Sequence, residues 1–75
     1  MTEETVTTLI RQVSPGSPRL SSKANLMDDL GFDSIKMLEL IVEIENKFNI
    51  QISEQDLNIN YFSTVDSICE LLKKY

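Results

Sequence analysis

The chain has 75 residues, of which 41% are hydrophobic and 25% are charged. This balance is typical of a globular domain rather than a disordered segment, and the length predicts one domain over residues 1–75. Seven basic and twelve acidic residues give a net charge of −5. That charge disfavours binding to nucleic-acid phosphates and suits protein partners with basic surfaces.

Residues that the chain lacks disfavour further classes of function. It has no histidine, the usual general base and the commonest metal ligand, and its one cysteine, Cys69, cannot form an internal disulfide or a zinc site. No apolar run approaches the about 20 residues of a membrane-spanning helix. The N-terminus carries Glu3 and Glu4 where a signal peptide has basic residues. We therefore expect a cytoplasmic, monomeric, non-enzymatic protein without a metal site.

Apolar residues spaced by three, four and seven positions predict a first helix over residues 2–13, and the prolines and glycine of residues 14–18 end it. Residues 14–32 then form a long connection with little periodicity. We expect four apolar side chains to fix it to the core, namely Leu20, Leu26, Met27 and Leu30. Gly31 is expected to supply a tight turn before the next helix.

The second helix is predicted over residues 34–48, with Asp33 as its N-cap and Phe32 and Met37 as a hydrophobic staple. At 100° per residue, one face gathers the expected core residues, namely Met37, Leu40, Ile41, Ile44 and Phe48. Another face gathers Ile35, Leu38 and Val42, bordered by Glu39, Glu45 and Asn46. This second apolar face is either covered by the long connection or a third helix, or exposed as a docking surface.

Two further helices are predicted in the C-terminal half. A short one over residues 53–59 would begin with a Ser53–Asp56 capping box and an Ile52–Leu57 staple. A last one over residues 64–74 would turn four residues to the core, namely Val65, Ile68, Cys69 and Leu72. The expected fold is an all-α four-helix bundle, with three main helices, one short helix and a long loop between helices one and two.

The segment Asp29–Ile35 places Ser34 in the first turn of the second helix, after a glycine turn and an acidic cap. A phosphate esterified to this hydroxyl would lie near the unpaired N–H groups and the positive end of the helix dipole. Serine at a helix start is also a common capping residue, so the tripeptide Asp33-Ser34-Ile35 alone does not decide between a modification site and a structural cap.

Residues 28–48, DDLGFDSIKMLELIVEIENKF, resemble the acyl carrier and peptidyl carrier proteins, whose signature is D-L-G-x-D-S-[LI] before an E-L…E…F helix. The resemblance implies that a phosphopantetheinyl transferase attaches 4′-phosphopantetheine from coenzyme A to Ser34, and that the arm carries acyl or aminoacyl thioesters. It also implies that partners bind along the second helix. The expected partner-binding residues are Asp33, Ile35, Leu38, Glu39, Val42 and Glu45.

The chain departs from carriers of primary fatty-acid synthesis in ways that predict a specialised role. Lys36 stands where those carriers usually have an acid, Ile35 replaces leucine, and the short third helix has only Glu54 and Asp56 as acids. These differences favour a polyketide, nonribosomal-peptide or specialised fatty-acyl pathway, with a loading ligase or adenylating enzyme and synthase or transferase partners. The alternative is an unmodified carrier-like regulatory module, and the intact Ser34 favours the carrier.

The acids around the motif also invite comparison with a calcium loop. An EF-hand that began at Asp28 would need oxygen ligands at Leu30 and Phe32, which have none. A calcium site of this type is therefore rejected.

Overall fold

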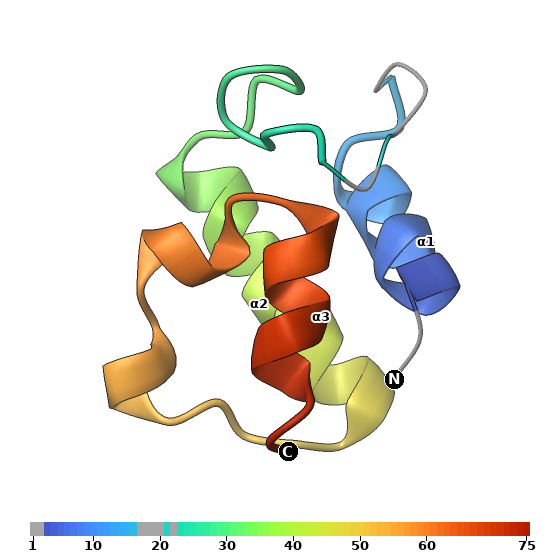
Figure 1. Ribbon diagram of the computed structural model, residues 1–75. Helices are drawn as coiled ribbons and strands as arrows, with labels where there is room; N and C mark the ends of the chain where they lie inside the picture. The colour runs from blue at the N-terminus through green and yellow to red at the C-terminus, as the bar shows by residue number, and fades with distance from the viewer. Residues whose placement is uncertain (1–2, 17–20, 22) are drawn as a thin grey trace.

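The computed structural model describes residues 3–16, 21 and 23–75, and these residues form three helices joined by a long loop and two short 3-10 turns (Figure 1). The helices are α1 (Glu3–Val13), α2 (Ser34–Phe48) and α3 (Val65–Leu72). The 3-10 turns are η1 (Glu54–Asp56) and η2 (Ile59–Phe62). The predicted all-α class is confirmed. The first helix matches its prediction as far as it is described, since residue 2 lies outside the described residues.

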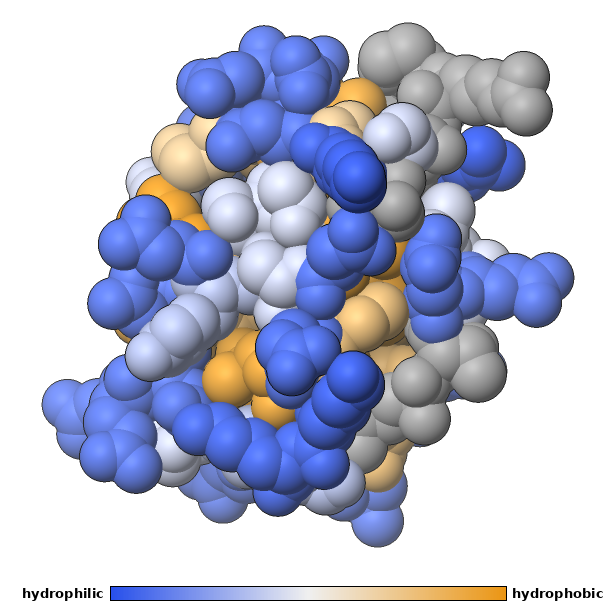
Figure 2. Space-filling model, viewed as in Figure 1, coloured by the Kyte–Doolittle hydropathy of each residue, from blue (hydrophilic) through white to orange (hydrophobic). Residues whose placement is uncertain are grey.

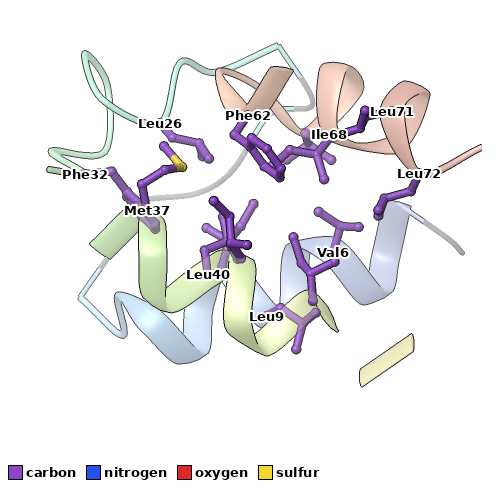
Figure 3. Close-up of a cluster of buried hydrophobic side chains, with 14 of the residues drawn as sticks. Val6, Leu9, Leu26, Phe32, Met37, Leu40, Phe62, Ile68, Leu71 and Leu72 are labelled. Carbon is purple, nitrogen blue, oxygen red and sulfur yellow. The ribbon is translucent and has the colours of Figure 1, made fainter. Parts of the chain in front are cut away.

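The core is one cluster of apolar side chains from all three helices (Figure 3). The residues predicted to face it are largely buried, and those of α2 are Met37, Leu40, Ile41 and Ile44. Phe48 and Cys69 are half-buried at its edge. Leu71 is buried as well, although the predicted apolar face of the last helix did not include it. Three amphipathic helices therefore share one buried interior.

Helix α2 begins and ends as its sequence predicts. The backbone N–H of Lys36 donates to Asp33 Oδ1 at 2.8 Å, which is the predicted N-cap. Phe32 and Met37, the predicted staple, are both buried in the core cluster. At the other end, Asn49 adopts a left-handed conformation with φ of 54°, so the chain turns out of the helix.

The long connection is fixed to the core by fewer residues than predicted. Leu26 is buried, and its backbone N–H donates to the Ser63 carbonyl at 2.8 Å, while Leu30 packs partly against the core. The prediction for Met27 is wrong, because its side chain is exposed. Leu20 lies outside the described residues.

The predicted helix over residues 53–59 is replaced by the two 3-10 turns, with a break at Leu57. The capping box is wrong, because the Ser53 hydroxyl donates to the Asp56 carboxylate at 2.9 Å instead of capping backbone N–H groups. The staple is wrong as well, because Ile52 is buried but Leu57 is exposed. Without an apolar face of its own, this segment gains too little from packing to hold a regular helix.

Helix α3 is shorter than the predicted 64–74. Thr64 caps its start through a reciprocal box with Ser67, at 3.0 Å in both directions. Its end comes at Leu72, and the backbone N–H of Tyr75 bonds three residues back to Leu72. Lys74 and Tyr75 leave the helical path to contact the segment that follows α2.

Candidate functional site

Ser34 is exposed and is the first residue of α2, as the motif predicts. Gly31 precedes it with φ of +71°, a conformation that other L residues rarely adopt, so the chain can turn sharply before the helix. Asp33 satisfies the N–H of Lys36, and the Asp33 carbonyl accepts from the N–H of Met37 at 2.9 Å. The hydroxyl therefore stands at a well-formed helix start, where the dipole favours an attached phosphate.

The turn before the motif is held by its own hydrogen bonds. The Asn25 side-chain oxygen accepts from the N–H groups of Met27 and Asp28 at 3.0 and 2.9 Å. The Asp29 carboxylate in turn accepts from the N–H of Asn25 at 2.8 Å. These bonds give Asp29 a structural role. In the described part of the chain, no three His, Cys, Asp or Glu side chains come together as candidate metal ligands.

An open apolar groove of about 250 Å³ begins at Ser34 and runs between α2 and the 3-10 segments. In Figure 1, the orange segment that carries η2 lies beside the start of α2. We call this groove the Ser34 groove, and its lining residues are Ser34, Met37, Leu38, Ile41, Leu57, Asn58, Ile59 and Phe62. Its volume is slightly below the about 300–1,000 Å³ of typical ligand pockets, so it suits a short apolar group.

The second apolar face of α2 is exposed. The exposed fractions are 67% for Ile35, 62% for Leu38 and 51% for Val42, and we call these three residues the apolar stripe. The described residues do not cover it, which supports the docking interpretation over the covered one. The face shown in Figure 2 is largely hydrophilic, with small apolar patches between the hydrophilic side chains.

The apolar stripe forms one wall of a second open groove, which lies between α1 and α2. Val13 and Gln12 of α1 line the opposite wall, and Glu39 and Glu43 add negative charge. Leu38 lines both this groove and the Ser34 groove, so it is the ridge between them. The α1–α2 groove thus combines an apolar wall with acidic side chains, which fits an apolar partner surface rimmed by basic residues.

Lys36 has a structural contact that accounts for its presence near the motif. Its ammonium donates to the Val13 carbonyl at 3.4 Å. That carbonyl lies at the C-terminal end of α1, where the helix dipole favours a cation. An acidic side chain at position 36 would instead be repelled by the negative C-terminal end of α1.

The structure places five of the six predicted partner-binding residues around the start and exposed side of α2. The exception is Glu45, whose carboxylate accepts the N–H of Ile52 at 3.0 Å and so positions the chain after α2. Asp33 belongs to the site but also serves as the N-cap. Glu39 is exposed and lines the same groove as the apolar stripe.

One polar cluster has no counterpart in the sequence predictions. Asp56 is only 4% exposed, and its carboxylate accepts hydrogen bonds from Lys74, Tyr75 and Ser53. The hydrogen bond from Lys74, followed by that from Tyr75, lowers the pKa of Asp56 from 3.8 to about 2. We call these four residues the Asp56 cluster. The local Ser53–Asp56 spacing could not reveal it, because Lys74 and Tyr75 lie 18 and 19 residues from Asp56 along the chain.

Cys69 shows no sign of reactivity. The thiol is half-buried on the core-facing side of α3. Burial, together with the nearby acids Glu3 and Asp66, raises the pKa of this thiol above its ordinary value. A raised pKa leaves little thiolate at neutral pH, which fits the predicted role as a small core residue.

Comparison with known proteins gives a consistent result. A family model described as a phosphopantetheine attachment site matches residues 4–72. The acyl carrier protein of Phytoplasma australiense is 35% identical over 72 residues, which cover 96% of this chain and 92% of that protein. The acyl carrier protein of Amoebophilus asiaticus is 32% identical, with coverage of 96% and 88%.

Solved structures show the same likeness. A candidate acyl carrier protein from Mycobacterium tuberculosis has a TM-score of 0.80 and 32% identity, with 95% of this chain and 93% of that chain covered. A chain from the complex of the Bradyrhizobium japonicum glycine:carrier-protein ligase with glycylated carrier protein has a TM-score of 0.84. Its identity is 17%, with coverage of 92% and 95%, so this second likeness concerns the fold alone.

Proposed function

The chain belongs to the phosphopantetheine-binding acyl carrier proteins, a non-catalytic family, and on this premise we propose that Ser34 is the residue that carries its 4′-phosphopantetheine arm. The observation that carries the proposal is the exposed hydroxyl of Ser34 at the first residue of α2. The capped helix start favours the phosphate of the arm, and the exposed position leaves room for a transferase to reach the hydroxyl. When attached, the arm supplies the thiol that holds cargo as a thioester.

The Ser34 groove supports a cargo with apolar character. Its walls are formed mainly by apolar side chains, and its exposed members Leu38, Leu57 and Ile59 gain from any apolar group that covers them. We propose acyl or aminoacyl groups as the cargo, within a polyketide, nonribosomal-peptide or specialised fatty-acyl pathway. A carrier of the same fold is glycylated in complex with its ligase, which supports a loading ligase or adenylating enzyme as a partner here.

The apolar stripe and Glu39 form the proposed docking surface for the phosphopantetheinyl transferase, the loading enzyme and the synthase or transferase that uses the cargo. Ile35 follows the serine directly and Leu38 lies one helical turn beyond it, so a partner that covers them has the arm close to its own contact area. Across residues 3–16, 21 and 23–75, no helix is long and apolar enough to cross a membrane. The cytoplasmic location and the monomeric state expected from the sequence remain part of this proposal.

The proposal is tested by loading the protein with coenzyme A, magnesium and a broad-specificity phosphopantetheinyl transferase. Mass spectrometry should show the addition of one phosphopantetheine to the wild type and none to Ser34→Ala. Ser21→Ala, which removes another exposed serine, is the matched control and should load fully. Loading of Ser34→Ala would refute the assignment. Failure of the wild type to load, with a known carrier loaded in parallel, would favour the unmodified regulatory module.

A further inference from the structure

The segment between Ile52 and Phe62 is held on the protein in an unusual way. All of residues 53–61 are described, and Asp56 is the one buried residue among them. Leu57, Ile59 and Tyr61 are all exposed. A loop segment of this length is ordinarily fixed by buried apolar side chains, but here a charged carboxylate occupies the buried position.

The contacts of Asp56 join this segment to the end of α3. Lys74 Nζ donates to Oδ1 at 2.9 Å, and the Tyr75 hydroxyl donates to Oδ2 at 2.5 Å. The Tyr75 oxygen also accepts the backbone N–H of Ser53 at 3.0 Å, so the tyrosine contacts both ends of η1. A buried carboxylate left without these partners is costly, which makes the position of η1 depend on all of them.

The same segment forms one wall of the Ser34 groove. Leu57, Asn58 and Ile59 follow Asp56 directly and face the α2 wall, whose Met37 and Ile41 belong to the buried core. The α2 wall is therefore fixed by apolar packing, whereas the opposite wall is fixed at its near end by the Asp56 cluster. The far end of this wall is Phe62, which is fully buried in the core and stays fixed by apolar packing. Moving only the part formed by Leu57 and Ile59 exposes little additional apolar surface, because these side chains are already 48% and 46% exposed.

We propose that the Asp56 cluster is a positioning device that holds residues 53–61 against α2 and thereby sets the width of the Ser34 groove and the amount of cargo it covers. The part concerning cargo rests on the proposed function. The part concerning the wall does not, because it depends only on contacts within this chain. Lys74 and Tyr75 are in this sense specificity-determining residues that touch neither Ser34 nor the groove.

Two variants weaken the cluster and leave its surroundings in place. Tyr75→Phe removes the hydroxyl and keeps the ring, while Lys74→Gln removes the ammonium. Lys73→Gln is the matched control, because this neighbouring lysine pairs with the exposed Glu70 and undergoes the same charge change. Ser53→Ala removes a hydroxyl that contacts Asp56 and Tyr75 but leaves both of those side chains in place, so it is a milder variant in case the others unfold the chain.

The first readout is backbone amide hydrogen exchange in the protein without an arm. The N–H groups of Leu57 and Tyr61 bond within the segment, to the carbonyls of Glu54 and Asn58. We expect them to exchange about tenfold faster in Tyr75→Phe and Lys74→Gln, the effect of losing roughly one hydrogen bond. The amides of Ile41 and Ile44 should speed up by no more than the loss of unfolding free energy measured in urea, and every amide in Lys73→Gln should keep its wild-type rate. Unchanged exchange at Leu57 and Tyr61 would overturn the proposal.

The second readout is the emission of an environment-sensitive fluorophore carried on a short acyl chain at the end of the arm. In wild type, the groove should shift this emission to the blue, and the shift should be reduced in Tyr75→Phe and kept in Lys73→Gln. Equal emission in all three loaded proteins would overturn the role in cargo cover. Loading is measured first by mass, so failure of Ser34 modification is distinguished from failure of the cluster to hold the wall.

Discussion

Replacing Ile44 and Val42, which lie two residues apart on α2, separates the core from the proposed docking surface. Ile44 is fully buried in the core, whereas Val42 is half exposed on the apolar stripe. Ile44→Ala removes three carbons and leaves a cavity, which costs about 2–5 kcal/mol of unfolding free energy. Val42→Gln changes a surface position and should alter that free energy by no more than about 0.5 kcal/mol.

The expected difference is large on the scale of this protein. For a domain of this size, 1 kcal/mol corresponds to roughly 4–8 °C in Tm, so Ile44→Ala should melt at least about 8 °C earlier than the wild type. Val42→Gln should melt within about 4 °C of it. Thermal and urea denaturation followed by far-UV circular dichroism measure both variants in the same buffer.

A loading assay on the same proteins completes the test. Val42→Gln should slow transfer of the arm or cargo by a partner enzyme, because the docking surface loses an apolar contact. Ile44→Ala should affect loading only in proportion to the fraction unfolded. The assignment of two faces to α2 is refuted if Val42→Gln melts as early as Ile44→Ala. A normal melt together with unchanged loading would instead remove Val42 from the docking surface.

Three further predictions follow from particular contacts. Glu39→Lys should slow loading at low salt and lose that effect at high salt, as stopped-flow kinetics would show, whereas salt-independent rates would contradict a docking role. Because the pKa of Asp56 is about 2 in the folded protein against an ordinary 3.8, its stabilising effect is complete above pH 4 and is lost as pH falls towards 2. The urea midpoints of wild type and Asp56→Asn should therefore converge as the pH falls from 4 towards 2. A constant difference between the two midpoints would contradict the stabilising role of the Asp56 carboxylate. Gly31→Ala should cost about 1–2 kcal/mol in urea titrations because φ is +71°, and an unchanged midpoint would show that the turn relaxes.

The sequence predicts α2 to the residue because every local signal agrees. Asp33 caps the start, Asn49 turns the chain at the end, and the apolar residues between them repeat with one helical period. These interactions span only a few residues, so they can be found without knowledge of the fold. The position of Ser34 at the start of α2 follows from the same signals, although its modification stays a prediction.

The predictions fail where a residue is used by a distant partner. Ser53 and Asp56 have the spacing of a capping box, but the Asp56 carboxylate accepts hydrogen bonds from Lys74 and Tyr75 instead of capping the helix start. Glu45 lies near the exposed side of α2 on a helical projection, yet its carboxylate binds the N–H of Ile52. In both cases the side chain satisfies a polar group that only the folded chain brings near, and periodicity carries no information about it.

Leu38 belongs to two surfaces at once, since it lines both the α1–α2 groove and the Ser34 groove. One side chain cannot take different rotamers for its two neighbours, so any cargo that displaces Leu38 also reshapes the surface met by a docking enzyme. If cargo occupies the Ser34 groove and a partner docks on the apolar stripe, as proposed, the two binding events would be thermodynamically linked, and the coupling would be reciprocal. A partner that bound the loaded form more tightly would then strengthen the binding of the cargo in the groove by the same free energy. Through this one exposed leucine, an enzyme bound to the stripe would distinguish the empty from the loaded protein.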